Sequence, residues 1–219
     1  MKTIIKSVGL LLITLSLSIQ TQAQQGLHIG IIGDPTNTWM LNSDDSDDSN
    51  HELKPTISAA FGLGIGYNFG DNMGIEVNAL YSLEGQRYEI GGVEFHQKND
   101  YLKIPLMLTY NSDPSASVMF LGKVGPQLGV LVGSKLNDGD GNELIDDTKD
   151  VFAATTIGAA ASLGVGFNLS ENLQLTTGLK FDYSFTNTDD EDYEFYDNNR
   201  ATTNNMVGGL EVGLRYVIK

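Results

Sequence analysis

The sequence predicts an all-β fold: an eight-stranded antiparallel transmembrane up-and-down β-barrel. Three observations support this prediction. Apolar residues alternate with small or polar ones along eight segments, long connections alternate with short ones, and one hairpin pattern occurs twice. Alternation of this kind is typical of strands that place one face toward lipid and the other toward a barrel interior.

The eight alternating segments are spread over most of the chain. They lie at residues 26–32, 57–69, 73–83, 102–110, 118–132, 153–169, 173–185 and 206–218. The short connections are near 70–72, 111–116 and 170–172, and the long ones span about 34–54, 86–99, 134–151 and 186–203. Short periplasmic turns and long external loops are typical of transmembrane barrels, so we expect both termini to be periplasmic.

One hairpin pattern is repeated at a fixed distance. The stretch LGIGYNFGDN at 63–72 returns as LGVGFNLSEN at 163–172, and the similarity continues without gaps to residues 81 and 181. The hairpin of the second and third predicted strands is therefore expected to resemble the hairpin of the sixth and seventh.

Both copies of the repeat carry glycine at alternate positions of one strand face. Glycine inside a strand costs roughly 0.5–1 kcal/mol relative to alanine, so this pattern needs a structural reason. We expect Gly64 to lie opposite Asn78 and Gly66 opposite Glu76. The glycines would then leave room for larger polar side chains in a narrow lumen.

The polar face of the strands is predicted to line the lumen. From Thr56 to Asn68 it has no charged residue and is largely Gly, Ala and Ser, whereas a water-exposed surface usually carries Lys, Glu and Arg. A soluble lipocalin-like barrel with an apolar lumen is the alternative. Aromatic residues of the apolar face gather near strand ends, as in an interfacial girdle. They are Tyr67, Phe69, Tyr110, Phe120, Phe167, Phe181, Tyr183, Phe185 and Tyr216.

Four acidic and four basic residues fall on the polar face. They are Glu76, Glu84, Asp182, Glu211, Lys103, Lys123, Lys180 and Arg215. An unpaired buried charge is strongly destabilising, so equal numbers of opposite charges in an acidic chain predict a paired network in the lumen. We expect Glu76 and Arg215 to lie nearer the short turns than the lysines do.

Composition and the first residues limit the classes of function. The chain has no cysteine, which excludes thiolate metal sites, disulfides and lipoprotein acylation.

The apolar run Val8–Ile19 follows two lysines and precedes Ala23, as in a secretory signal peptide; an uncleaved anchor is the alternative. We expect residues 1–23 to be removed and 24–219 to form one barrel domain. Without those lysines, 11 basic residues (13 − 2) face 28 acidic ones, which argues against a nucleic-acid partner.

The stretch YLKIPLMLTY at 101–110, followed by GKVGPQLGVLV at 122–132, resembles the PorT-like outer-membrane β-barrel family. The matching residues are Tyr101, Leu102, Ile104, Pro105, Leu106, Tyr110, Gly125, Pro126 and Gly129. Two positions depart from the pattern: Thr109 stands where a basic residue is common, and the chain ends in Lys219 rather than an aromatic residue. The resemblance implies a Gram-negative outer-membrane location and a role near a secretion machine, and it supplies no shared catalytic residues.

Few residues fit catalytic or metal chemistry. The three histidines, His28, His51 and His96, do not lie beside a serine-containing motif, so we predict no catalytic residues. The period-two glycines do not match a phosphate-binding loop. No cofactor is expected.

The acidic loops contain one weak metal candidate. Asp138, Asp140 and Asn142 occupy positions one, three and five of a calcium loop, but Glu143 stands where that loop needs glycine. A specific metal site is therefore not predicted. Loosely bound divalent cations that bridge the loops, or bridge them to lipopolysaccharide, are an expectation beside plain solvation.

The sequence therefore favours a non-enzymatic outer-membrane barrel with a structural or interaction role. Its expected partners are outer-membrane lipid, lipopolysaccharide and an envelope protein. Two alternatives are a narrow channel for small solutes or ions and a lipid-modifying enzyme.

Overall fold

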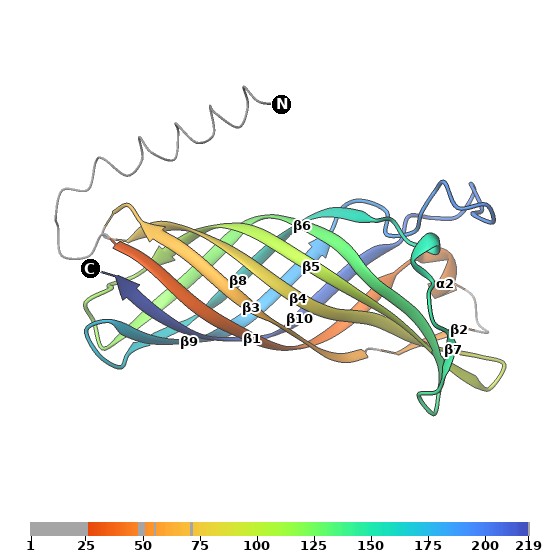
Figure 1. The fold of residues 1–219 in the computed structure, drawn as a ribbon, viewed down its shortest axis with the longest axis horizontal. Coiled ribbons are helices and arrows are strands. Elements are labelled where there is room, and N and C mark those ends of the chain that lie inside the picture. Colours follow the sequence, from red (N-terminus) through yellow and green to blue (C-terminus); the bar gives the residue numbers. More distant parts are fainter. Residues whose placement is uncertain (1–25, 48–50, 55, 71, 219) are drawn as a thin grey trace, which may run out of the picture.

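The computed structural model describes residues 26–47, 51–54, 56–70 and 72–218. Within them, eight long strands form the barrel (Figure 1). These are β1 (Gly26–Leu41), β3 (Thr56–Asn68), β4 (Met73–Ile90), β5 (Val93–Asn111), β6 (Val118–Asp138), β8 (Thr155–Asn168), β9 (Leu173–Ser184) and β10 (Asn204–Ile218). Each pairs antiparallel with the next, and β1 pairs with β10, so the sheet closes on itself. The predicted fold class is confirmed, while the predicted signal segment 1–23 lies outside the described residues.

Four short elements lie at one end of the barrel. The strand β2 (His51–Lys54) pairs with β4, and β7 (Glu143–Ile145) pairs with β6. The helix α2 (Ser43–Asp47) follows β1, and the 3-10 helix η1 (Lys149–Val151) precedes β8. We call this end, with the segments that join its strands, the long-loop end.

Two of the predicted long loops are largely strand. The segment 86–99 is a continuous hairpin whose turn is Gly91–Gly92, at φ of 58° and 85°, values that glycine adopts without strain. In the 34–54 segment, β1 continues to Leu41. Strands of 16 to 21 residues such as β1, β4, β5 and β6 exceed the 9–11 or so needed to cross a bilayer. The barrel wall therefore extends well beyond the membrane at the long-loop end.

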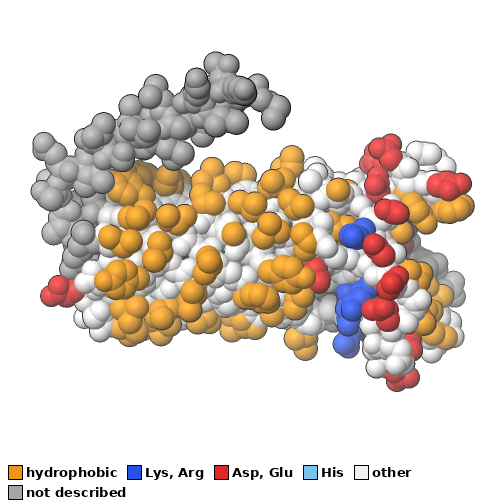
Figure 2. All heavy atoms as spheres, in the orientation of Figure 1, with side chains coloured by type: hydrophobic (Ala, Val, Ile, Leu, Met, Phe, Trp, Pro, Cys, Tyr) orange, Lys and Arg blue, Asp and Glu red, His pale blue; other side chains and the backbone are white. Residues whose placement is uncertain are grey.

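The alternation of the strands separates an apolar outer face from a polar lumen. Outward residues such as Ile57, Leu63 and Leu163 are more than 60% exposed, and Figure 2 shows apolar side chains covering most of the barrel's length while charged ones gather at the long-loop end. Inward positions of the same strands carry polar side chains that are buried. The predicted orientation of the two faces is confirmed.

The register in the first repeat explains its glycines. Gly64 pairs with Asn78 and Gly66 with Glu76, as predicted. A Cβ atom at Gly66 would collide with the imidazole of His28. Glycine at this position therefore gives a luminal side chain of the neighbouring strand the space it occupies.

Candidate functional site

The charged residues nearest the short turns form one cluster around Glu76. Its Oε1 accepts a hydrogen bond from Lys123 Nζ at 3.0 Å, and its Oε2 accepts one from Arg215 Nη2 at 2.7 Å. The Nε2 atom of His28 lies 3.2 Å from Oε2. Lys123 also donates to Glu211 Oε1 at 2.7 Å. Because these side chains come from β4, β6, β10 and β1, the cluster ties opposite walls of the barrel together.

The other predicted charges form two further sets of ion pairs. Lys103 pairs with Glu84 and, at 2.6 Å, with Asp182 Oδ1, and Lys180 Nζ donates to Asp34 Oδ2 at 2.6 Å. The structure thus brings all eight predicted luminal charges into buried ion pairs. Lys123 contacts both Glu76 and Glu211, so Glu76 and Arg215 are linked to the charges expected to lie farther from the short turns.

Two members of the clusters were absent from the predicted network. Asp34 lies at the start of the predicted loop 34–54, and His28 lies on the first predicted strand. The signal for Asp34 is the continued alternation of β1, which places Asp34, Thr36 and Thr38 on the buried face. Alternation continued past residue 32 therefore predicts that the side chain of Asp34 faces the lumen.

The lumen between these side chains is almost completely filled. The cavity beside His28, Glu76, Lys123 and Arg215 has a volume of about 10 Å³. One water molecule needs roughly 10–15 Å³. The space left beside these four side chains is therefore about that of one water molecule.

The long-loop end is held by a second set of ion pairs. Arg200, in the loop between β9 and β10, donates to both carboxylate oxygens of Asp45 at 2.9 and 2.8 Å, and its Nε donates to Asp189 at 3.0 Å. The hydrogen bond to Asp45 is the largest cause that raises the pKa of Arg200 above its usual value. The backbone N–H of Ala201 donates to Asp44 at 2.7 Å. These contacts fasten the last loop onto the first.

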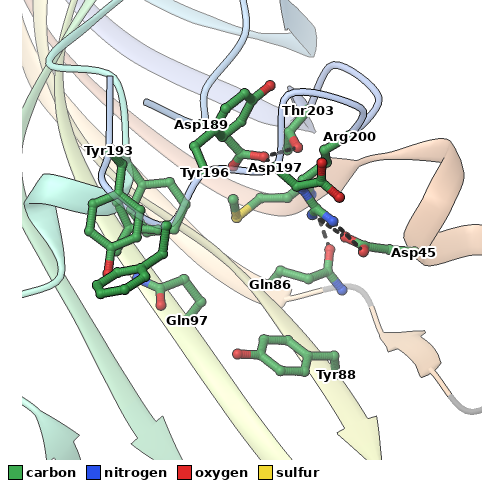
Figure 3. A pocket seen from close by; sticks show the side chains of 14 residues that line it. Asp45, Gln86, Tyr88, Gln97, Asp189, Tyr193, Tyr196, Asp197, Arg200 and Thr203 are labelled. Carbon is green, nitrogen blue, oxygen red and sulfur yellow. Dashed lines mark hydrogen bonds and ion pairs between the residues drawn. The ribbon is translucent and has the colours of Figure 1, made fainter. Parts of the chain in front are cut away.

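We call the contacts of Arg200 with Asp45 and Asp189 the Arg200 clamp. A pocket of about 430 Å³ opens beside it (Figure 3). Its lining comes from β1, α2, β4, β5, the segment around η1 and the β9–β10 loop. Five lining residues are aromatic: Tyr88, Phe152, Tyr193, Phe195 and Tyr196. In Figure 3 Tyr193 lies across the pocket from Arg200 and Asp45. The luminal end of the pocket is formed by polar side chains such as Gln86 and Gln97, which are buried.

Comparison with known proteins identifies the class of barrel. The sequence matches the model of the family described as outer membrane protein beta-barrel domain over residues 20–190. The chain belongs to this family. The search of curated proteins finds no match. The narrower resemblance to PorT-like proteins stays a prediction.

Solved structures of outer-membrane proteins share the fold. Neisserial surface protein A is 15% identical, with a TM-score of 0.54 over 88% of this chain and 97% of its own. OprG from Pseudomonas aeruginosa is 15% identical, with a TM-score of 0.50 over 89% of this chain and 97% of its own. At this identity the likeness concerns the fold alone. In outer-membrane barrels the long loops are extracellular, so we call the 430 Å³ cavity the mouth pocket.

The weak calcium candidate of this outer-membrane barrel forms a hairpin turn instead. Asp138 accepts hydrogen bonds from the backbone N–H of Asn142 at 2.8 Å and from its side-chain amide at 3.0 Å. Asp140 is exposed. Across the described residues, no group of three or more His, Asp or Glu side chains is arranged to hold a metal ion, and no helix among them is long and apolar enough to cross a membrane.

The Arg200 clamp of the outer-membrane barrel is expected to limit the opening of the β9–β10 loop. In Arg200→Ala, the amide of Ala201 is expected to exchange its hydrogen about fivefold faster, as for loss of about 1 kcal/mol from partly exposed charge-assisted hydrogen bonds. Hydrogen exchange followed by mass spectrometry measures this rate. Arg87→Ala, at an exposed arginine of β4, is the matched control and should leave the rate unchanged; equal rates in both variants would contradict the clamp.

Proposed function

We propose that this outer-membrane barrel is a closed, non-enzymatic protein that acts by binding partners at its extracellular end. The main support for this proposal is the filled lumen, in which buried ion pairs join different strands beside a cavity of about 10 Å³. Opening a path for solutes would separate several of these pairs, and each separated charge would be left uncompensated. This argues against the alternative of a narrow channel.

The contacts of His28 also favour a role without catalysis. His28 lies against Glu76, whose carboxylate is already held by Arg215 and Lys123. A catalytic dyad needs a nucleophile within hydrogen-bond reach of the base, whereas His28 Nε2 faces the carboxylate of Glu76. The side chain of His51 lies outside the described part of the chain. We therefore rank a lipid-modifying enzyme last.

The extracellular end offers apolar side chains for contact with a partner. Ile90, Val93, Leu144, Ile145 and Phe195 are between 41% and 76% exposed. They lie on the β4–β5 hairpin, on β7 and on the β9–β10 loop, at the long-loop end. Exposed apolar groups outside the bilayer often mark interaction sites. An external partner, together with lipopolysaccharide and outer-membrane lipid, fits this surface; the PorT-like resemblance adds an envelope protein as the periplasmic candidate.

Planar-bilayer recording of the refolded barrel tests the proposal. We expect no discrete conductance steps under conditions in which a general porin conducts, because the paired charges close the lumen. The porin is the positive control. Reproducible steps from the barrel would contradict the closed state and favour the channel.

The non-enzymatic part of the proposal has its own test. Lipid A incubated with the refolded barrel should keep its mass, as measured by mass spectrometry against a sample without protein. A new lipid A species that appears only with the barrel would contradict this part.

A further inference from the structure

We propose that the mouth pocket binds an organic cation: an ammonium group carried on a small molecule or on a lysine side chain of an external peptide. This inference rests on the proposed function, that the barrel acts by binding at its extracellular end. It adds the chemical class of the ligand.

The size and walls of the pocket suit a small organic group. Its volume of about 430 Å³ lies within the roughly 300–1,000 Å³ typical of ligand sites. The walls come from segments far apart in the sequence, and the Arg200–Asp45 pair, 155 residues apart, holds two of them together. The pocket is therefore formed before a ligand arrives.

Aromatic rings form the apolar part of the wall. Phe152 is 7% exposed, whereas Phe195 is 76% exposed, so the rings run from the interior of the pocket to its rim. Tyr193 and Phe195 make an edge-on contact with centroids 5.6 Å apart. The face of an aromatic ring is negative and attracts a cation within about 6 Å of its centre.

The charge of the pocket selects against anions. Arg200 is the one cationic side chain among the described lining residues, and it is already bonded to Asp45 and Asp189. Asp197 also lines the pocket, so the acidic side chains there outnumber the basic one by two. An anionic ligand would compete with two carboxylates for the guanidinium, whereas a cation meets an excess of negative charge.

The rim extends this negative field. The β9–β10 loop carries six carboxylates against one arginine: Asp189, Asp190, Glu191, Asp192, Glu194 and Asp197. Figure 2 shows acidic side chains gathered at this end. A field of one sign around a concave site raises the local concentration of the opposite charge. Acidic rim and aromatic wall therefore favour the same class of ligand.

A neutral saccharide is the competing ligand, because sugars also stack on aromatic rings. The two classes differ in charge. Choline and its uncharged isostere 3,3-dimethylbutan-1-ol have nearly the same shape, so they separate the contribution of charge from that of apolar contact.

Isothermal titration of the refolded full-length barrel in nanodiscs tests the inference with four probes: choline, Nα-acetyl-lysine amide, 3,3-dimethylbutan-1-ol and glucose. We expect both cations to bind at least about fivefold more tightly than the uncharged isostere, as for a cation–π contact of about 1 kcal/mol. Choline alone would indicate a small-molecule source, and Nα-acetyl-lysine amide alone a peptide source. Equal binding of choline and its isostere without tighter binding of Nα-acetyl-lysine amide, binding of glucose only, or binding of no probe would overturn the inference.

Variants locate the site. Tyr193→Leu and Asp197→Asn should each weaken binding of the cations about two- to fivefold, and Asp140→Asn, at an exposed acid that does not line the pocket, is the matched control and should not. Equal loss in Asp197→Asn and Asp140→Asn would overturn the assignment to this pocket. A barrel that stays closed in bilayer recordings yet binds no cation would overturn this inference and leave the closed state of the barrel intact.

Discussion

Glu76→Gln is expected to lower the free energy of unfolding of the barrel by about 3–5 kcal/mol, as for removal of one partner from a buried ion pair. Glu76 is 2% exposed and contacts Lys123, Arg215 and His28. Glutamine keeps the size of the side chain and removes its charge. Lys123 retains Glu211, but Arg215 loses its carboxylate partner in a lumen that admits little water.

Unfolding in urea from lipid vesicles, followed by tryptophan fluorescence and heat-modifiable gel migration, measures the change. Glu143→Gln is the matched control, since Glu143 pairs with Lys135 at 3.3 Å and both side chains are nearly half exposed. An exposed pair contributes about 0–1 kcal/mol. Equal effects of the two variants would show that the luminal pairs are as well solvated as the surface pair.

The luminal side of the fold could be predicted because a strand repeats every two residues. Lys103 and Asp182 lie 79 positions apart, yet both sit on the polar phase of their strands, and a barrel of eight strands is narrow enough for opposite walls to touch. The equal numbers of acidic and basic residues on this polar face then predict that the luminal charges pair with one another. Asp34 is outside the predicted network because the predicted first strand ends at residue 32, whereas β1 continues to Leu41.

Periodicity gives no such help at the extracellular end. The pairing of Arg200 with Asp45 depends on how two irregular segments meet in space, and no sequence spacing encodes that. The β4–β5 hairpin, which stands where the loop 86–99 is predicted, does have a sequence signal. Gly91 and Gly92 lie between Ile90 and Val93, which is a recognised hairpin signal, and it would have extended both strands beyond the membrane.

The glycines of β3 point to a constraint that acts on the backbone as well as on side chains. At Gly66 the nearest atoms to a Cβ belong to the His28 side chain, with the backbone oxygen of Ile75 at 2.7 Å. At Gly62 all of the nearest atoms are backbone: a Cβ atom would collide with the carbonyl oxygen of Ala79 and lie 2.9 Å from Leu80 Cα. A backbone atom cannot rotate away as a side chain can. Position 62 therefore controls how closely β3 and β4 approach as the sheet curves.

Gly62→Ala is accordingly expected to destabilise the barrel by at least about 3 kcal/mol, the upper part of the range for overpacked interiors, or to prevent refolding. Gly33→Ala is the control, because a Cβ atom at Gly33 meets no atom within 4 Å and should change the free energy of unfolding by about 1 kcal/mol or less. Refolding yield by heat-modifiable migration and urea unfolding compare the two. Equal yields and equal midpoints would mean that the β3–β4 pair moves apart freely, and glycine at position 62 would then have no structural requirement.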